Sequence, residues 1–338
     1  MRSTLEPGGA APEVAPGEPL RRVDGRLVVL LIVIALGARG MLGGALNPVA
    51  LRTWTTVFVA IVVQALPFLA LGVLVSGAIT ALVSPAVLER VLPRSALLAV
   101  PSAALAGTAL PGCECASVPI AGRLCARGVQ PAAAVTFMLA APAVNPVVLV
   151  ATAVAFPGQP QMVLGRFLGS LLTSMVVGLI WYRVGGHAWV ERARQRLAST
   201  AGGGRGWVGF AGAARHDLWD AGGWLVVGAA AAATLQVVVP RSLVLAVADH
   251  PALSVLALGG LAVLLAICSE ADAFVAASLR EFSLTARVVF LVVGPAVDVK
   301  LIAMQAGVFG RRFAARFAPL TFAVAVLCAL AVAGVVLR

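Results

Sequence analysis

The sharpest chemical motif of the sequence is a pair of cysteines separated by a single acid, Cys113-Glu114-Cys115. A proline and a glycine come directly before it, so a helix is expected to begin here and to run over about 113–127. A helix N-terminus favours the thiolate, which is the nucleophilic and metal-binding form of cysteine. Buried cysteines can also pack as small apolar side chains, but a buried carboxylate between them needs a partner. We interpret the motif as a binding site.

A second group of chemically active residues follows Cys268, in the run Cys268-Ser269-Glu270-Ala271-Asp272. Two carboxylates in an apolar segment are costly and often mark an ion or proton pathway. The alternative is an internal ion pair between Asp272 and an arginine from a loop. Glu270 and Asp272 are candidate site residues on the first interpretation.

The only lysine of the chain, Lys300, lies two residues after Asp298 in an apolar stretch. Residues two apart do not face each other on a regular helix, so the two charges are expected to have separate partners. Asp272 and Glu270 are the candidate partners of Lys300. The lysine serves either in ion coupling or in a structural ion pair that locks two segments together.

These residues lie in a chain that is too apolar to be a soluble protein. Of its 338 residues, 61% are hydrophobic and 12% charged, and the mean hydropathy is +1.01. Soluble domains carry about 25% charged residues. A soluble enzyme, a nucleic-acid-binding protein and a disordered protein are therefore excluded. The net charge of +11 is explained by arginine in cytoplasmic loops, so membrane lipid and not nucleic acid is the expected partner.

The fold class predicted is an all-α polytopic membrane protein with about seven transmembrane helices and two re-entrant or broken-helix hairpins. A disordered tail is expected over 1–20, followed by a first transmembrane helix within 21–50. The hairpins are expected at 96–128 and 251–280, because polar or helix-breaking residues interrupt each stretch. The other spans are long enough to cross a bilayer and are expected at 54–83, 131–156, 160–182, 217–239, 284–309 and 317–337.

The organisation predicted is a repeat A over 51–183, a basic cytoplasmic loop over 184–216 and a repeat B over 217–338. The placement of arginine favours a cytoplasmic N-terminus and an external C-terminus. On this topology, Arg123 is one of the basic residues that flank the first hairpin on the cytoplasmic side. The expected location is the bacterial cytoplasmic (inner) membrane.

An internal repeat relates the candidate residues of the two halves. A shift of 153 residues places Cys115 on Cys268 and Asn145 on Asp298, without a gap. With the predicted topology the repeat is inverted, a common plan of transporters whose site lies at the repeat interface near the bilayer midplane. Asn145 either bonds to backbone groups freed by the neighbouring prolines or lines that cavity.

The same residues carry a resemblance. The run 110–119, Gly128, Phe137 and the run 141–146 resemble the signature of a bacterial predicted-permease family that includes the organoarsenical efflux permease ArsP. The runs 269–276 and 294–300 resemble its second block, and the resemblance covers about 54–310. It implies a multi-spanning inner-membrane permease.

The leading hypothesis is a permease, not an enzyme, that exports a soft, thiol-binding solute by ion-coupled alternating access. A trivalent organoarsenical or a thiophilic metal ion would bind the thiolates of Cys113, Cys115 and Cys268. No cofactor is expected, and no GxxxxGK[ST] motif is present in the sequence, so energy would come from an ion gradient or an accessory subunit. The alternatives are a membrane thiol oxidoreductase that uses Cys113 and Cys115, and a structural or assembly protein. The predicted substrate-binding residues are Cys113, Glu114, Cys115, Asn145, Cys268, Glu270, Asp272, Asp298 and Lys300.

Overall fold

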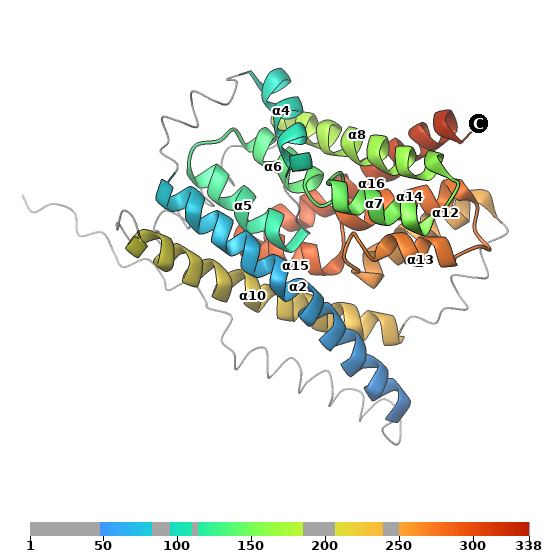
Figure 1. Cartoon of the computed structure of the whole chain (residues 1–338), viewed down its shortest axis with the longest axis horizontal. Helices are drawn as coiled ribbons and strands as arrows, with labels where there is room; N and C mark the ends of the chain where they lie inside the picture. Colours follow the sequence, from blue (N-terminus) through green and yellow to red (C-terminus); the bar gives the residue numbers. More distant parts are fainter. Residues whose placement is uncertain (1–47, 83–94, 110–113, 185–206, 239–249, 338) are drawn as a thin grey trace, which may run out of the picture.

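The computed structural model describes residues 48–82, 95–109, 114–184, 207–238 and 250–337, and in these ranges every regular element is a helix (Figure 1). This confirms the all-α prediction. The predicted tail 1–20, the first transmembrane helix within 21–50 and most of the loop 184–216 lie outside the described residues. The helices are α2 (Pro48–Leu82), α4 (Ala96–Ala109), α5 (Glu114–Ala126), α6 (Pro131–Ala140), α7 (Pro146–Ala155), α8 (Pro160–Val184), α10 (Trp207–Val238), α12 (Pro251–Leu265), α13 (Asp272–Ser278), α14 (Leu284–Ala296), α15 (Val299–Val308) and α16 (Arg311–Val336).

Long apolar helices dominate the described structure. Five segments are long and apolar enough to cross a membrane, namely Ala50–Ala78, Pro160–Arg183, Phe210–Val237, Leu284–Val308 and Arg311–Val336. They correspond to five of the spans predicted from the sequence. Helix α10 begins at Trp207, ten residues before the predicted start of that span. The chain is a polytopic membrane protein.

Two segments predicted as continuous spans are each broken in the middle, which corrects the sequence-based prediction of only two interrupted stretches. The segment 131–156 divides into α6 and α7, and 284–309 divides into α14 and α15. Proline explains both breaks, because it lacks the N–H that an internal helical hydrogen bond needs. Pro146 is the first residue of α7, and Pro295 lies in the last turn of α14.

Both predicted hairpins are interrupted as expected. The first divides into α4 and α5, and the second into α12 and α13. In the second, α12 ends at Leu265, and the residue that follows, Ala266, has a φ of 48°, the single positive value of a non-glycine residue in the described part of the chain. The segment from Ala266 to Ala271 is irregular, and it lies in the interior, where Cys268 and Ser269 are buried.

The described helices repeat along the chain with the offset of 153 residues. Both ends of α7 coincide with both ends of α15, and α6 and α14 begin at equivalent residues. The two halves also pack against each other, since α5 of the first half contacts α15 of the second, and α13 of the second half contacts α7 of the first. The internal repeat is thus a property of the structure, while its inverted orientation in the membrane stays a prediction.

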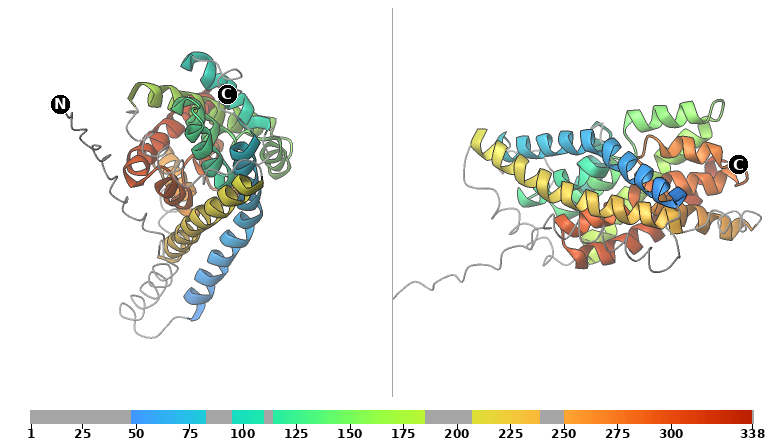
Figure 2. Two further views of the ribbon diagram at one scale, coloured as in Figure 1. Left: turned by 90° about the vertical axis from the view of Figure 1, so that its left-hand side faces the viewer. Right: turned by 90° about the horizontal axis from the view of Figure 1, so that it is seen from below.

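Helices α2 and α10 pack along each other at one side of the bundle, where α2 also contacts α5 and α10 contacts α15 (Figures 1 and 2). The span Leu284–Val308, made of α14 and α15, is the most deeply buried of the five. Helices α8 and α16 pack through aromatic rings, with Trp181 edge-on to Phe313 and Phe317 at 5.2 Å. The half-helices α5, α14 and α15 lie mainly in the interior, whereas α4, α7 and α12 expose apolar side chains such as Leu98, Val150 and Leu256.

Candidate functional site

A buried ion pair joins the two halves of the chain at the start of two half-helices. Glu114 is the first residue of α5, and Lys300 is the second residue of α15. Lys300 Nζ lies 2.5 Å from Glu114 Oε1, and both side chains are fully buried. The ammonium also lies 3.4 Å from the carbonyl oxygen of Ala266. A buried charge is tolerated only with partners of this kind.

The structure corrects the predicted partners of Lys300. Neither Asp272 nor Glu270 pairs closely with Lys300. The carboxylate of Asp272 is bound by Arg166, and the carboxylate next to the Lys300 ammonium is that of Glu114. Asp298 Oδ1 accepts the backbone N–H of Leu301 at 2.5 Å. Its second oxygen, Oδ2, lies 3.9 Å from Lys300 Nζ, a longer electrostatic contact.

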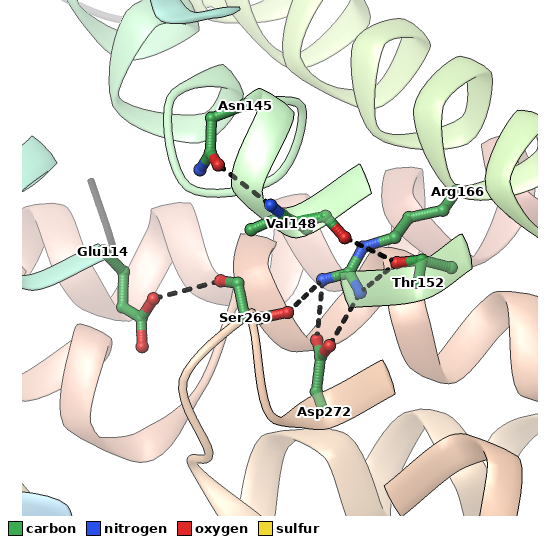
Figure 3. Close-up of polar contacts among 7 residues, drawn as sticks. All are labelled: Glu114, Asn145, Val148, Thr152, Arg166, Ser269 and Asp272. Carbon is green, nitrogen blue, oxygen red and sulfur yellow. Dashed lines mark hydrogen bonds and ion pairs between the residues drawn. The ribbon is translucent and has the colours of Figure 1, made fainter. Parts of the chain in front are cut away.

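A second buried ion pair lies beside the first. Arg166 of α8 donates two hydrogen bonds to Asp272, from Nη1 to Oδ1 at 2.7 Å and from Nη2 to Oδ2 at 3.0 Å. The same guanidinium donates to the Ser269 carbonyl at 2.8 Å and to Thr152 Oγ1 at 3.0 Å (Figure 3). Such a bidentate pair is typical of arginine with a carboxylate, and it is both stronger and more specific in geometry than a single hydrogen bond.

Arg166 was missed by the sequence analysis, although a signal was present. An arginine within the apolar span 160–182 is itself a rare intramembrane charge and predicts a buried partner. The expected alternative partner of Asp272 was an arginine from a loop. The partner is an arginine, but it belongs to a membrane-spanning helix.

Ser269 connects the two ion pairs. Its hydroxyl donates to Glu114 Oε2 at 3.2 Å, while its carbonyl oxygen accepts from Arg166 (Figure 3). The irregular backbone between α12 and α13 makes this possible, because the Ser269 carbonyl does not accept an intrahelical hydrogen bond. A continuous polar network therefore runs from Lys300 to Thr152 through the protein interior.

The residues at positions 145 and 298 play the same structural role in the two halves. Asn145 precedes α7 and its Oδ1 accepts the N–H of Val148 at 3.0 Å, as Asp298 Oδ1 accepts that of Leu301. Asn145 Nδ2 also donates to the carbonyl of Ala141 at 3.0 Å, which agrees with the expectation that it bonds to freed backbone groups. Both side chains satisfy helix N-termini, as asparagine and aspartate commonly do.

Two of the three predicted thiols are buried close to the Glu114–Lys300 pair. Cys115 is 0% and Cys268 is 2% exposed, and both are free thiols. Lys300 interacts electrostatically with both of them. Cys113 lies outside the described residues, and in the ranges that are described no three His, Cys, Asp or Glu side chains are arranged to hold a metal ion. A metal site made by all three cysteines stays a prediction.

Glu270 lies at the edge of the network and is partly buried. It interacts electrostatically with Glu114, Arg166 and Lys300. Its Oε2 is buried without a hydrogen-bond partner among the described residues. The structure thus brings most of the predicted site residues into one region, and they come from both repeats.

A separate buried cluster lies at the other end of α5. Arg123 donates from Nε to Asp217 Oδ2 at 3.0 Å and from Nη2 to Oδ1 at 2.5 Å, and Ser76 Oγ donates to Oδ2 at 2.6 Å. Arg123, one of the basic residues expected to flank the first hairpin on the cytoplasmic side, is only 2% exposed. It is buried because Asp217 of α10 offers a carboxylate inside the helix packing. Its side of the membrane stays a prediction.

Two glycines let the long helices approach the site closely. A Cβ at Gly228 of α10 would lie 2.7 Å from Lys300 Cα, and one at Gly72 of α2 would lie 2.5 Å from Ala116 Cα. Small residues at helix contacts are a common device of membrane proteins. The backbones that carry Glu114, Cys115 and Lys300 are therefore supported directly by α2 and α10.

Known proteins are similar to this chain over most of its length. Residues 50–334 match the ArsP-type family described as "Predicted permease". The chain belongs to this permease family. The UPF0718 protein YcgR of Bacillus subtilis is 36% identical over 284 residues, which cover 81% of this chain and 94% of the relative.

A second relative of this ArsP-type permease comes from Streptococcus mutans serotype c and is named as a subunit of a two-component membrane permease complex. It is 32% identical over 266 residues, which cover 77% of this chain and 88% of the relative. No solved structure matches the chain. The resemblance noted in the sequence is confirmed, and the protein is a multi-pass permease of the bacterial cytoplasmic membrane.

Proposed function

We propose that this permease exports a soft, thiol-binding solute, either a trivalent organoarsenical or a thiophilic metal ion, by ion-coupled alternating access. The solute would bind where the half-helices of the two repeats meet. Cys115 and Cys268 would be its thiolate ligands, with Cys113 as a third. Thiolates are the ligands that soft metals and metalloids prefer.

One observation carries this proposal: each repeat contributes one buried thiol to the surroundings of the same lysine. Cys115 follows Glu114 at the start of α5, and Cys268 lies in the irregular segment that follows α12. Both interact electrostatically with Lys300. A site shared by both repeats can be opened to either side of the membrane by moving one repeat against the other.

The charged and amide residues would have distinct roles around the solute. Glu114 and Lys300 would exchange partners as the solute enters, and Asp298 and Glu270 would hold ionic or proton charge. Asp272 has two hydrogen bonds from Arg166 and would position the segment that carries Cys268. Asn145 would hold the N-terminus of α7 at the cavity.

Energy would come from an ion gradient or from an accessory subunit. The Streptococcus mutans relative is named as part of a two-component complex, which supports a partner protein for this chain as well. Such a partner would be encoded separately and would be found by purifying the tagged permease from its own host.

The alternative of a thiol oxidoreductase is less well supported. Exchange with a partner's disulfide needs a cysteine that the partner can reach. Cys115 is 0% exposed and lies beside a buried ion pair. The alternative of an assembly protein would treat the two ion pairs as structural locks only, and the following experiment separates it from transport.

The test compares survival in methylarsenite of cells that express the chain, its cysteine variants or no gene. We expect the chain to protect, Cys115→Ser and Cys268→Ser to remove protection, and Cys328→Ser to keep it, since Cys328 lies on α16 and has no part in the network. Uptake into everted membrane vesicles would confirm the direction. Full protection by the double variant Cys115→Ser/Cys268→Ser would end the thiolate mechanism.

A further inference from the structure

The two helix caps that the repeat relates differ in one respect: position 145 is an amide and position 298 is an acid. Asn145 performs the capping role completely, because its Oδ1 accepts from Val148 and its Nδ2 donates to Ala141. An uncharged asparagine is therefore sufficient for this geometry. An acid at position 298 is therefore not needed to cap the helix, and its charge must have another role.

Asp298 has no good partner for its second oxygen. The residue is 1% exposed, and Oδ2 forms no hydrogen bond with any described residue. The nearest cation, Lys300 at 3.9 Å, already donates to Glu114 at 2.5 Å. An ionised carboxylate in this position is costly in the interior of a membrane protein.

The charges of the network leave Asp298 without a counter-charge of its own. Two cations, Arg166 and Lys300, face four carboxylates, and each cation forms its close pair with one acid. Asp298 is faced by Glu114 of α5, while Cys115, Cys268 and Glu270 surround Lys300. No side chain of the described parts of α10 and α16 pairs with it. The carboxylates in the network are Glu114, Glu270, Asp272 and Asp298.

Protonation resolves the imbalance at Asp298. A neutral carboxyl group has one O–H donor and one carbonyl acceptor, which is the same pair that an asparagine side chain offers. Protonated Asp298 would thus match Asn145, and its Oδ1 could still accept from Leu301. Asn145 donates to the carbonyl oxygen of Ala141. In the second repeat, the residue equivalent to Ala141 is Gly294.

We propose that Asp298 is the proton-binding carboxylate that couples transport to the proton gradient. This rests on the proposed permease function, and it names both the coupling ion and its residue. The carboxylate takes up one proton from the side of higher proton concentration and releases it to the other side. No other bond is made or broken.

The position of Lys300 supplies the link between proton and solute. An ionised Asp298 competes with Glu114 for the ammonium group, while a protonated Asp298 does not. Proton binding therefore decides whether α15 is held tightly to α5 through Lys300 and Glu114. Since Cys115 follows Glu114 on α5, the same event changes the surroundings of a proposed solute ligand.

Infrared difference spectroscopy of the purified full-length protein at two pH values tests the proton site without any solute. We expect the band of a protonated carboxyl group in the unmodified protein and its loss in Asp298→Asn. The variant Glu281→Gln is the matched control, because it removes an exposed acid in the same way and should keep the band. Labelling aspartate carboxyls with heavy carbon should shift the band in the unmodified protein, which keeps the test valid if a variant folds poorly. A band that persists in Asp298→Asn, or that does not shift on labelling, overturns the proposal.

Proteoliposomes loaded with a pH-sensitive dye test the coupling. Methylarsenite movement should be accompanied by an opposite proton flux in the unmodified protein. Asp298→Asn should abolish the response of methylarsenite movement to the pH gradient, whereas the control Glu281→Gln should retain it. An undiminished response in this variant overturns the proposal. If the unmodified protein moves no methylarsenite, the proposed solute is wrong, and the infrared result still decides the proton site.

Discussion

Glu114 of the first repeat and Lys300 of the second form an ion pair with 2.5 Å between its charged atoms, although 186 residues separate them in the chain. Each lies in the first turn of a half-helix, and each half-helix belongs to a different repeat. The pair is therefore the point at which the two halves of the permease are joined by charge and not only by packing.

Removing one member of this pair should destabilise the protein strongly. Lys300→Met leaves the buried Glu114 carboxylate without its cation, and such a loss costs about 3–5 kcal/mol. The double variant Glu114→Gln/Lys300→Met removes both charges and should recover most of that loss. Thermal unfolding in detergent measures both. A double variant no more stable than Lys300→Met would show that Glu114 is not the partner, and a stable but inactive Lys300→Met would assign the lysine to function.

Arg166 should not be replaceable by lysine. Its guanidinium serves Asp272 with two hydrogen bonds and also serves the Ser269 carbonyl and Thr152, a geometry that a single ammonium group cannot reproduce. Arg166→Lys leaves buried acceptors unsatisfied, which costs about 1–3 kcal/mol each. The unfolding temperature of Arg166→Lys should therefore fall, and an unchanged value would mean that the pair contributes little to stability.

Gly228 should tolerate no side chain. A Cβ there would lie 2.7 Å from Lys300 Cα and 3.1 Å from its carbonyl oxygen, both backbone atoms that cannot rotate away. Gly228→Ala is expected to separate α10 from α15 and to cost about 1–3 kcal/mol. Gly260→Ala is the control, because nothing lies within 4 Å of a Cβ at that position of α12. Equal stability of the two variants would contradict the close approach.

The basic loop 184–216 is expected to be cytoplasmic. Its arginines give the strongest charge asymmetry of the sequence, and positively charged loops stay on the cytoplasmic side. A reporter enzyme fused after position 200 and active only in the cytoplasm should therefore be active. Activity of an export-dependent reporter at the same position would instead place the loop outside and reverse the topology.

The sequence predicted the register of the repeat and two of the four broken segments, those at 96–128 and 251–280, better than it predicted the contacts between helices. The alignment of Asn145 with Asp298 is visible in the sequence, because proline and a capping residue leave a local signature. Their matching N-caps and the coincident bounds of α7 and α15 follow from it.

The partners of the buried charges could not be predicted in this way. Which acid reaches Lys300 depends on how α5 and the irregular segment after α12 meet in space, and no spacing in the chain encodes that. Arg166 and Asp217 show the same limit, since each finds its partner on a helix far away in sequence. An arginine in a predicted span does indicate that some acid must be buried nearby, and that signal is available without a structure.

Helix α5 is held at both of its ends. Glu114 fixes its first turn to α15, and Arg123 fixes its last turn to α10 through Asp217, with Ser76 of α2 on the same carboxylate. Nine residues of helix separate these two points, roughly 13 Å at the usual rise. A helix held at both ends cannot tilt at one end without straining the contact at the other, although Pro119 between them interrupts its hydrogen bonding. A displacement of Glu114 should therefore also change the surroundings of Asp217. A spectroscopic probe on α10 near Asp217 would detect it.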